Sequence, residues 1–192
     1  NRQLGSNVLF NIGTDEHGGK IAEVAEKGGV DPKKFADDIS EKFRGGLSKL
    51  NISYDRFVRT TDVQHEKIAA IIWKAIEKDI YKKSYTGWYC VGCETYYTET
   101  HVKETNGVCP LHNRAYDKLD EENYFFKLSA YGPAIKDEIE SGRFSVVPES
   151  RKNEILNVIK SGLEDISVSR PSAKISWGIP VPGDPTQTMY VW

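Results

Sequence analysis

The stretch Asn7-Val-Leu-Phe-Asn-Ile12, followed by Gly13-Thr-Asp-Glu-His-Gly-Gly19, decides the fold class of this chain. An apolar run of this kind is typical of a buried strand in a parallel sheet, which is covered on both faces. The polar segment with its glycines then ends the strand, and residues 20–28 predict a short helix with apolar side chains on one face. Strand, polar loop and helix make up the first half of a βαβ unit, so we expect an α/β fold.

The loop after this strand holds the first candidate binding residues. In open α/β sheets, ligands bind beyond the carboxyl ends of the strands. Asp15 is a candidate to hold the ammonium group of a ligand through a charge-assisted hydrogen bond. His17 and Gly18 are candidates to let a nucleotide approach closely. An ordinary helix N-terminus with its capping acid has the same composition, so spacing alone leaves both interpretations open.

The rest of the chain predicts alternating helices and strands. Asp31-Pro32 is expected to open a helix, with Asp31 as its N-cap and proline at the first helical position. Thr61-x-x-Gln64 resembles a capping box, which would open a helix extending to about Asp79 with Ile68, Ile71 and Ile72 buried. The other expected elements are a short strand at 57–58, strands at 85–91, 95–99 and 123–127, helices at 130–141 and 149–161, a strand at 165–170 that returns to the sheet, and a last strand at 189–192.

All three cysteines of the chain lie in one pattern, Cys90-x2-Cys93 followed by Cys109-x2-His112. Each short turn points two side chains at one position, and Zn²⁺ favours four such ligands in a tetrahedron. All four coordination positions are filled by protein, which predicts a structural rather than a catalytic zinc. The alternatives are three reduced cysteines with an ordinary histidine, a disulfide with one free thiol, and His101 as the fourth ligand. Without that role His101 is expected to face solvent.

Length and composition set broad limits. The 192 residues allow one large or two small domains, and 39% hydrophobic with 28% charged residues is typical of a globular protein. The net charge of −2 provides no global basic field, so any RNA contact has to be local. No signal peptide and no apolar run of about 20 residues occur, and reduced cysteines fit the cytoplasm. The chain begins at Asn1 and stops in an apolar run, as expected of part of a longer protein.

Two residues near the end of the chain are further candidates. Arg170, at the end of a predicted strand, can bind an anion, although a solvated surface arginine is the alternative. Trp192 can wall an apolar ligand pocket, although a core position is the alternative. The sequence contains no GxGxxG, no Gly-Lys-Ser/Thr phosphate loop and no GxSxG, so a protease or an esterase is not expected.

Six segments together resemble the methionyl-tRNA synthetases in order and spacing. They are Gly13-Thr-Asp-Glu-His-Gly18, Gly87-Trp-Tyr-Cys-Val-Gly-Cys-Glu94, Glu122-Asn-Tyr-Phe-Phe126, Asp165-Ile-Ser-Val-Ser-Arg-Pro171, Trp177-Gly-Ile-Pro-Val-Pro182 and Tyr190-Val-Trp192. The single pair of metal-binding turns with a histidine is similar to the bacterial or organellar form. The resemblance implies a Rossmann-type parallel-sheet catalytic domain over 1–82 and 181–192. A zinc-binding connective insertion over 83–180 interrupts it.

The resemblance also implies a function. It implies a ligase that uses ATP with Mg²⁺ to activate methionine, and that then esterifies initiator and elongator tRNA(Met). Asp15 would bind the methionine ammonium, Trp192 would line the side-chain pocket, and Arg170 would support activation, with His17 and Gly18 in the same motif as Asp15. The two ATP signatures of the family, a His-Ile-Gly-His-like motif and Lys-Met-Ser-Lys-Ser, do not occur here, so this chain alone is expected to be inactive. The alternatives are a stand-alone zinc-binding module for RNA or protein, and a synthetase for another amino acid.

Overall fold

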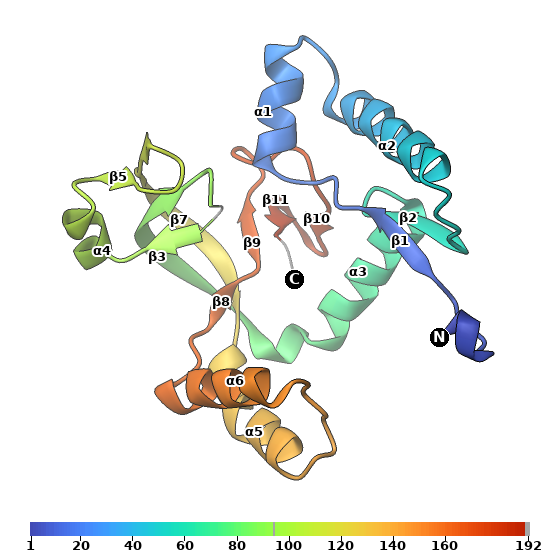
Figure 1. Cartoon of the computed structure of the whole chain (residues 1–192). Helices are drawn as coiled ribbons and strands as arrows, with labels where there is room; N and C mark the ends of the chain where they lie inside the picture. The colour runs from blue at the N-terminus through green and yellow to red at the C-terminus, as the bar shows by residue number, and fades with distance from the viewer. Residues whose placement is uncertain (94, 191–192) are drawn as a thin grey trace.

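The computed structural model describes residues 1–93 and 95–190 (Figure 1). Its helices are α1 (Gly19–Lys27), α2 (Pro32–Lys49), α3 (Val63–Ala75), α4 (Glu99–Glu104), α5 (Gly132–Glu140) and α6 (Glu149–Ser161), with short 3-10 turns at Arg2–Leu4, Glu77–Asp79 and Leu128–Tyr131. Its strands are β1 (Asn11–Thr14), β2 (Arg56–Arg59), β3 (Ile80–Cys90), β4 (Thr95–Tyr97), β5 (Val108–Cys109), β6 (Arg114–Ala115), β7 (Asp117–Phe126), β8 (Ile166–Ser167), β9 (Ser169–Pro171), β10 (Pro180–Val181) and β11 (Asp184–Met189).

The parallel pair β1–β2 confirms the predicted βαβ unit. The prediction that its first strand is buried is wrong, because the residues of β1 alternate between exposed and half-buried and Leu9 before it is 64% exposed. The register runs from Asn11 opposite Arg56 to Thr14 opposite Arg59, and α1 and α2 form the crossover. The strand begins four residues later than predicted. The Asp55 carboxylate accepts a hydrogen bond from the Phe10 backbone N–H at 2.6 Å, which takes that donor away from a backbone ladder. Within the described residues, the parallel sheet consists of these two strands.

The predicted N-cap is correct for α2 and wrong for α3. Asp31 caps α2 as expected, since its Oδ1 accepts from the Lys34 N–H at 3.0 Å and Pro32 follows at the first position. The capping box at Thr61 is wrong, because the N-cap of α3 is Asp62. The Thr61 hydroxyl instead donates to Glu16 at 2.5 Å, so a long-range contact replaces the local one.

A second sheet, in the order β4-β3-β7-β8, follows α3. Its strands are antiparallel, and β3 and β7 stay paired from Ile80 opposite Phe126 to Tyr89 opposite Asp117. The short strands predicted at 85–91 and 123–127 are therefore parts of two long strands. Helices α5 and α6, both predicted, pack against each other around Ile139 and are seen together at the bottom of Figure 1.

The segment predicted to return to the parallel sheet forms a separate antiparallel sheet in the order β10-β11-β9. The strand β11 was missed because Pro185 and its neighbouring prolines favour a loop. The predicted last strand at 189–192 is described only to Tyr190, and Trp192 lies outside the described residues. The core of Trp73, Val168 and Val181 joins α3 to this sheet. The helix α3 therefore links the parallel pair, which precedes it in the chain, to the sheet near the end of the chain.

Over the described part of the chain, every helix is too short or too polar to cross a bilayer.

Asp184 connects β11 to the second sheet. Its carboxylate accepts hydrogen bonds from Lys82 Nζ at 2.9 Å, from the Tyr124 hydroxyl at 3.1 Å and from the Thr186 N–H at 3.1 Å. Hydrogen bonds from Thr186 and then from Lys82 hold the pKa of this carboxyl well below the ordinary value of 3.8. A depressed pKa means that Asp184 stabilises the fold fully above that ordinary value and loses this effect as the pH falls through the folded-state value.

Asp184→Asn in the full-length protein should therefore lower the free energy of unfolding near neutral pH by about 1–2 kcal/mol. The variant should also lose less stability on acidification than the wild type does below pH 3.8. Thermal melting at several pH values measures both effects. Asp120→Asn is the control, because Asp120 is exposed and accepts one hydrogen bond, from Thr86. Equal acid sensitivity of Asp184→Asn and the wild type would contradict this prediction.

Candidate functional site

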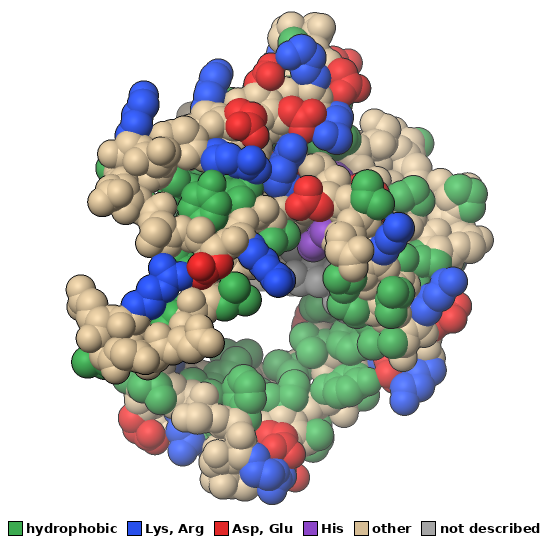
Figure 2. All heavy atoms as spheres, turned by 90° about the vertical axis from the view of Figure 1, so that its right-hand side faces the viewer, with side chains coloured by type: hydrophobic (Ala, Val, Ile, Leu, Met, Phe, Trp, Pro, Cys, Tyr) green, Lys and Arg blue, Asp and Glu red, His purple; other side chains and the backbone are tan. Residues whose placement is uncertain are grey.

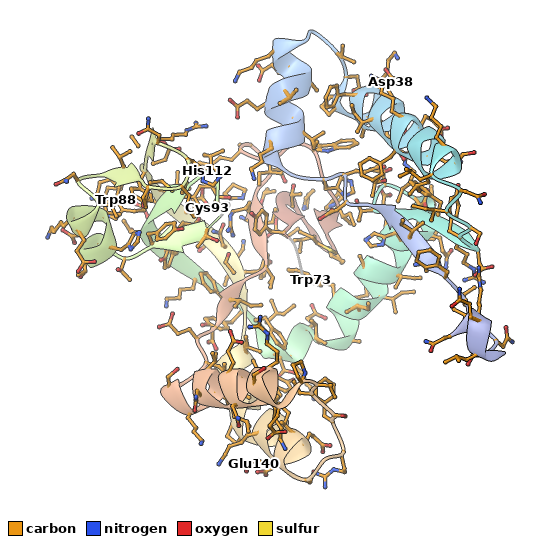
Figure 3. All side chains as sticks on the ribbon, viewed as in Figure 1. Asp38, Trp73, Trp88, Cys93, His112 and Glu140 are labelled. Atoms are coloured by element: carbon orange, nitrogen blue, oxygen red, sulfur yellow. The ribbon has the colours of Figure 1, made fainter. Side chains whose placement is uncertain are left out.

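The end of β3 and the β5–β6 hairpin bring together the predicted metal ligands Cys90, Cys93, Cys109 and His112. Their ligand atoms all lie within 4.8 Å of one another. Cys93 Sγ lies 3.5 Å from Cys109 Sγ and 3.3 Å from His112 Nδ1. A tetrahedron built on Zn–S bonds of about 2.3 Å has edges of about 3.8 Å, so these spacings fit one metal ion between the four atoms. Figure 3 shows Cys93 and His112 side by side.

The surroundings of the cluster also favour a metal. All three cysteines are free thiols, which argues against the disulfide alternative. Burial opposes ionisation of Cys109, but hydrogen bonds from the His112 ring and from backbone amides outweigh it and lower the pKa of this thiol to about 6. A thiolate is the form that binds metal. This cluster can therefore bind a metal such as zinc.

His101 is not the solvent-facing residue that the sequence predicts. Its ring stacks on Tyr97 with centroids 4.5 Å apart, and Nε2 lies 3.2 Å from the Tyr116 hydroxyl. Tyr116 belongs to the hydrophobic core that contains Cys90 and Cys109, and Tyr97 packs against that core. His101 thus packs beside the metal-binding cluster rather than in it.

Gly92 lies directly under the His112 ring. A Cβ atom added at Gly92 would lie 2.4 Å from His112 Cγ, so a larger residue has to displace the imidazole. We expect Gly92→Ala to weaken metal binding about ten- to a hundredfold, although all four ligands remain. Competition with a chromogenic chelator measures this affinity. Gly45→Ala, where an added Cβ meets open space, is the control, and unchanged affinity of Gly92→Ala would contradict this prediction.

The loop after β1 places Asp15 and His17 on a cavity of about 310 Å³. The cavity is otherwise lined by Thr60, His65, Ile68, Ala69, Ile72, Ile179, Met189 and Tyr190. Asp15 is exposed, so its carboxylate can meet a ligand that enters from solvent. Burial lowers the pKa of His17, which favours a neutral imidazole near neutral pH. The site thus combines an anionic group, two imidazoles and an apolar floor.

The apolar residues of α3 are more exposed to solvent than the sequence predicts. Ile68, Ile71 and Ile72 were expected in the core, but they are 45%, 66% and 49% exposed. Two of them, Ile68 and Ile72, line the cavity together with His65. Figure 2 shows hydrophobic side chains gathered around an opening on this side of the molecule. Positions 65, 68, 69 and 72 share one helical face, so periodicity identifies the face but not what it contacts.

Gly18 forms the N-cap of α1 in a conformation that favours glycine, with φ of 124°. Its carbonyl accepts the hydrogen bond from Ala22 that begins the helix. The structure therefore gives Gly18 a backbone role at the turn between the loop and α1.

Arg170 is buried, with 5% of its surface exposed, so the alternative of a solvated surface arginine is wrong. Its Nη1 donates to Ser167 Oγ at 2.6 Å and to the Ser169 carbonyl at 2.8 Å. The guanidinium carbon lies 4.9 Å from the ring centroid of Tyr96 and 4.2 Å from that of Tyr190. Since Tyr190 also lines the cavity beside Asp15, one ring separates Arg170 from that cavity.

Sequence reasoning missed two groups at this loop. The Glu16 carboxylate is buried between Thr14, Thr61 and Arg59, on the side of the loop away from the cavity. Trp177 Nε1 donates to the Glu16 carbonyl at 3.0 Å, and its ring lies 5.0 Å from that of His17. A buried carboxylate beside an arginine has no local pattern in the sequence, and neither does a contact across 161 positions.

Comparison with known proteins identifies the class of this protein. The family model described as tRNA synthetases class I (M) matches residues 1–121 and 106–192, which together cover the whole chain. The chain therefore belongs to this family of class I tRNA synthetases.

The individual relatives of this chain are methionine–tRNA ligases. The methionine–tRNA ligase of Caldanaerobacter subterraneus subsp. tengcongensis is 45% identical over 193 residues, covering 100% of this chain and 30% of the relative. The chloroplastic/mitochondrial methionine–tRNA ligase of Arabidopsis thaliana is also 45% identical, with 100% and 31% covered. A crystal structure of Mycobacterium tuberculosis methionyl-tRNA synthetase bound by methionyl-adenylate matches with a TM-score of 0.89 at 36% identity, covering 100% of this chain and 38% of that one. The chain thus spans about 30% of the length of the curated relatives named here.

Proposed function

We propose that the full-length protein containing this chain is a methionine–tRNA ligase. The observation that carries this proposal is the cavity beside Asp15, because its chemistry matches both ends of methionine. The exposed carboxylate suits an ammonium group, and the isoleucine and methionine side chains suit an unbranched thioether. The likeness to a synthetase described as bound by methionyl-adenylate supports the same assignment.

In this proposal the loop and the last segment of the chain hold the amino acid. Asp15 binds the methionine ammonium, His17 borders the same cavity, and Trp192 lines the side-chain pocket. Gly18 lets the nucleotide approach the turn before α1, and Arg170 supports the activation step through Tyr190. The methionine carboxylate attacks the α-phosphate of ATP, which is bound with Mg²⁺. Pyrophosphate leaves and methionyl-adenylate remains. A hydroxyl at the 3′ end of initiator or elongator tRNA(Met) then takes the methionyl group, and AMP leaves.

The proposed architecture has two parts. Residues 1–82 and 181–192 contribute to a Rossmann-type catalytic domain, and residues 83–180 form the connective insertion. The four-ligand cluster binds zinc with no protein ligand missing, so the metal has a structural role. The insertion then holds the returning segment in place, since Asp184 of β11 accepts a hydrogen bond from the Tyr124 hydroxyl and Gln187 donates one to the Glu122 carbonyl, both on β7.

Methionine-dependent pyrophosphate–ATP exchange by the full-length protein tests the function. Leucine, isoleucine, valine and cysteine serve as competing substrates in the same assay. Exchange with methionine alone is the expected result. Exchange with another amino acid would show a synthetase of different specificity, and exchange with none would favour a zinc-binding module for RNA or protein. Residues 1–192 alone should show no exchange, because neither ATP signature of the family occurs in this sequence.

A further inference from the structure

Residues Thr14 to His17 point alternately to two sides of the loop. Asp15 and His17 line the 310 Å³ cavity, whereas Thr14 and Glu16 point toward α2 and β2. An extended backbone produces this alternation, since successive side chains face opposite ways. Any force that fixes Glu16 therefore also fixes the direction of its neighbours Asp15 and His17.

The Glu16 carboxylate is held by hydrogen bonds on both oxygens. Oε1 accepts from Arg59 Nε at 2.6 Å and from the Thr14 hydroxyl at 2.6 Å. Oε2 accepts from Arg59 Nη2 at 2.8 Å and from the Thr61 hydroxyl at 2.5 Å. The side chain of Glu16 is 4% exposed and that of Arg59 is 16% exposed. Bidentate pairing of this kind restricts both position and orientation.

The backbone of Glu16 is fixed as well. Its N–H donates to Thr60 Oγ1 at 2.9 Å, and its carbonyl accepts from Trp177 Nε1 at 3.0 Å. Arg59 also reaches Asp37 on α2 at 2.5 Å, so the loop is tied to the helix as well as to β2. Burial raises the pKa of the Glu16 carboxyl, but the hydrogen bonds from Arg59, Thr14 and Thr61 outweigh burial and leave it below its ordinary value. The carboxylate is therefore ionised at neutral pH.

We propose that Glu16 and Arg59 are positioning residues of the amino-acid site. The ion pair holds the loop so that Asp15 and His17 face the cavity, and neither Glu16 nor Arg59 has to touch the substrate. This inference rests on the proposed function, because it assigns the loop's geometry to methionine binding. The proposed pair differs in one respect from an ion pair that only stabilises the fold. Weakening the pair should raise the KM for methionine more than the KM for ATP.

Glu16→Gln in the full-length protein tests the inference. Glutamine keeps the shape but offers Arg59 one acceptor instead of two. We expect the KM for methionine to rise about ten- to a hundredfold, because small displacements of binding groups have effects of this size. The KM for ATP should stay close to the wild-type value, while the melting temperature should fall, because the variant weakens a buried ion pair. Hydrogen exchange of the amides of residues 14–18 should become about tenfold faster even without substrate.

Glu138→Gln is the matched control. Glu138 also forms a bidentate pair, with Arg143 at 2.8 and 2.9 Å, but on an exposed surface of α5. This variant should leave both KM values and the exchange of residues 14–18 unchanged. If Glu16→Gln does not fold, Arg59→Lys replaces it, since lysine keeps the charge but loses the two-pronged geometry.

The outcomes separate the two proposals. Wild-type protein without methionine-dependent exchange would refute the proposed function, while the hydrogen-exchange comparison would still decide whether Glu16 fixes the loop. Normal methionine KM and normal amide exchange in Glu16→Gln would overturn the positioning role. An equal rise in the KM for methionine and in the KM for ATP would also overturn it, because a purely structural ion pair predicts that both sites weaken together.

Discussion

Asp15→Asn is expected to lower kcat/KM for methionine activation in the full-length protein by at least about thirtyfold. The carboxylate is the anionic group of the cavity wall, and in the proposed site asparagine would leave the methionine ammonium without its counter-charge in partly apolar surroundings. Truncating one partner of such a pair costs about 2–5 kcal/mol, and about 1.4 kcal/mol corresponds to a factor of ten. Pyrophosphate–ATP exchange at varied methionine concentration measures the loss.

Asp38→Asn is the control for this prediction. Asp38 is an exposed acid on α2 that pairs with Lys34 at 2.9 Å, and Figure 3 shows it far from Trp73 on α3. Removing its charge should leave methionine kinetics unchanged. An Asp15→Asn variant with nearly wild-type kcat/KM would show that another group holds the ammonium, and the assignment of this cavity to methionine would fail.

Loss of the metal is expected to unfold residues near 85–120. The core of this region consists of Cys90, Val102, Cys109 and Tyr116, so two of its four buried members are also metal ligands. The helix α4 has 6 residues and the β5–β6 hairpin has two residues in each strand, and elements so short do not persist alone. Structural zinc contributes about 10–16 kcal/mol of binding free energy in small domains, and for the proposed metal this binding free energy would be folding free energy.

Cys93→Ser is the variant that tests this coupling. We expect metal content to fall and protease cleavage to appear within residues 85–120 at the same time, as measured by elemental analysis and by mass spectrometry of the fragments. A chelator should reproduce the cleavage pattern in the wild-type protein. Leu111→Ser is the control, because Leu111 lies between the ligands Cys109 and His112 but is 79% exposed. Full metal content in Cys93→Ser would remove Cys93 from the ligand set.

Local sequence patterns predict the parts of this molecule whose contacts are also local. The cap at Asp31, the helices α5 and α6, and the four-residue metal pattern all depend on residues close together in the chain, and all were predicted. The exposed face of α3 was not, because helical spacing shows that Ile68 and Ile72 share a side but not what covers it. Glu16 was missed for the same reason, since Arg59 lies 43 positions away.

The hydrogen bond from Trp177 to the carbonyl of Glu16 links residues 161 positions apart. Contacts of high sequence separation form late in folding, because the intervening chain must first be brought into place. On the ribosome, the loop with Asp15 and His17 emerges long before Trp177 does, and domains fold as they are synthesised. The order of synthesis therefore sets an order of assembly. The loop with Asp15 and His17 acquires the contact from Trp177 only once the second sheet and helices α5 and α6 have been made.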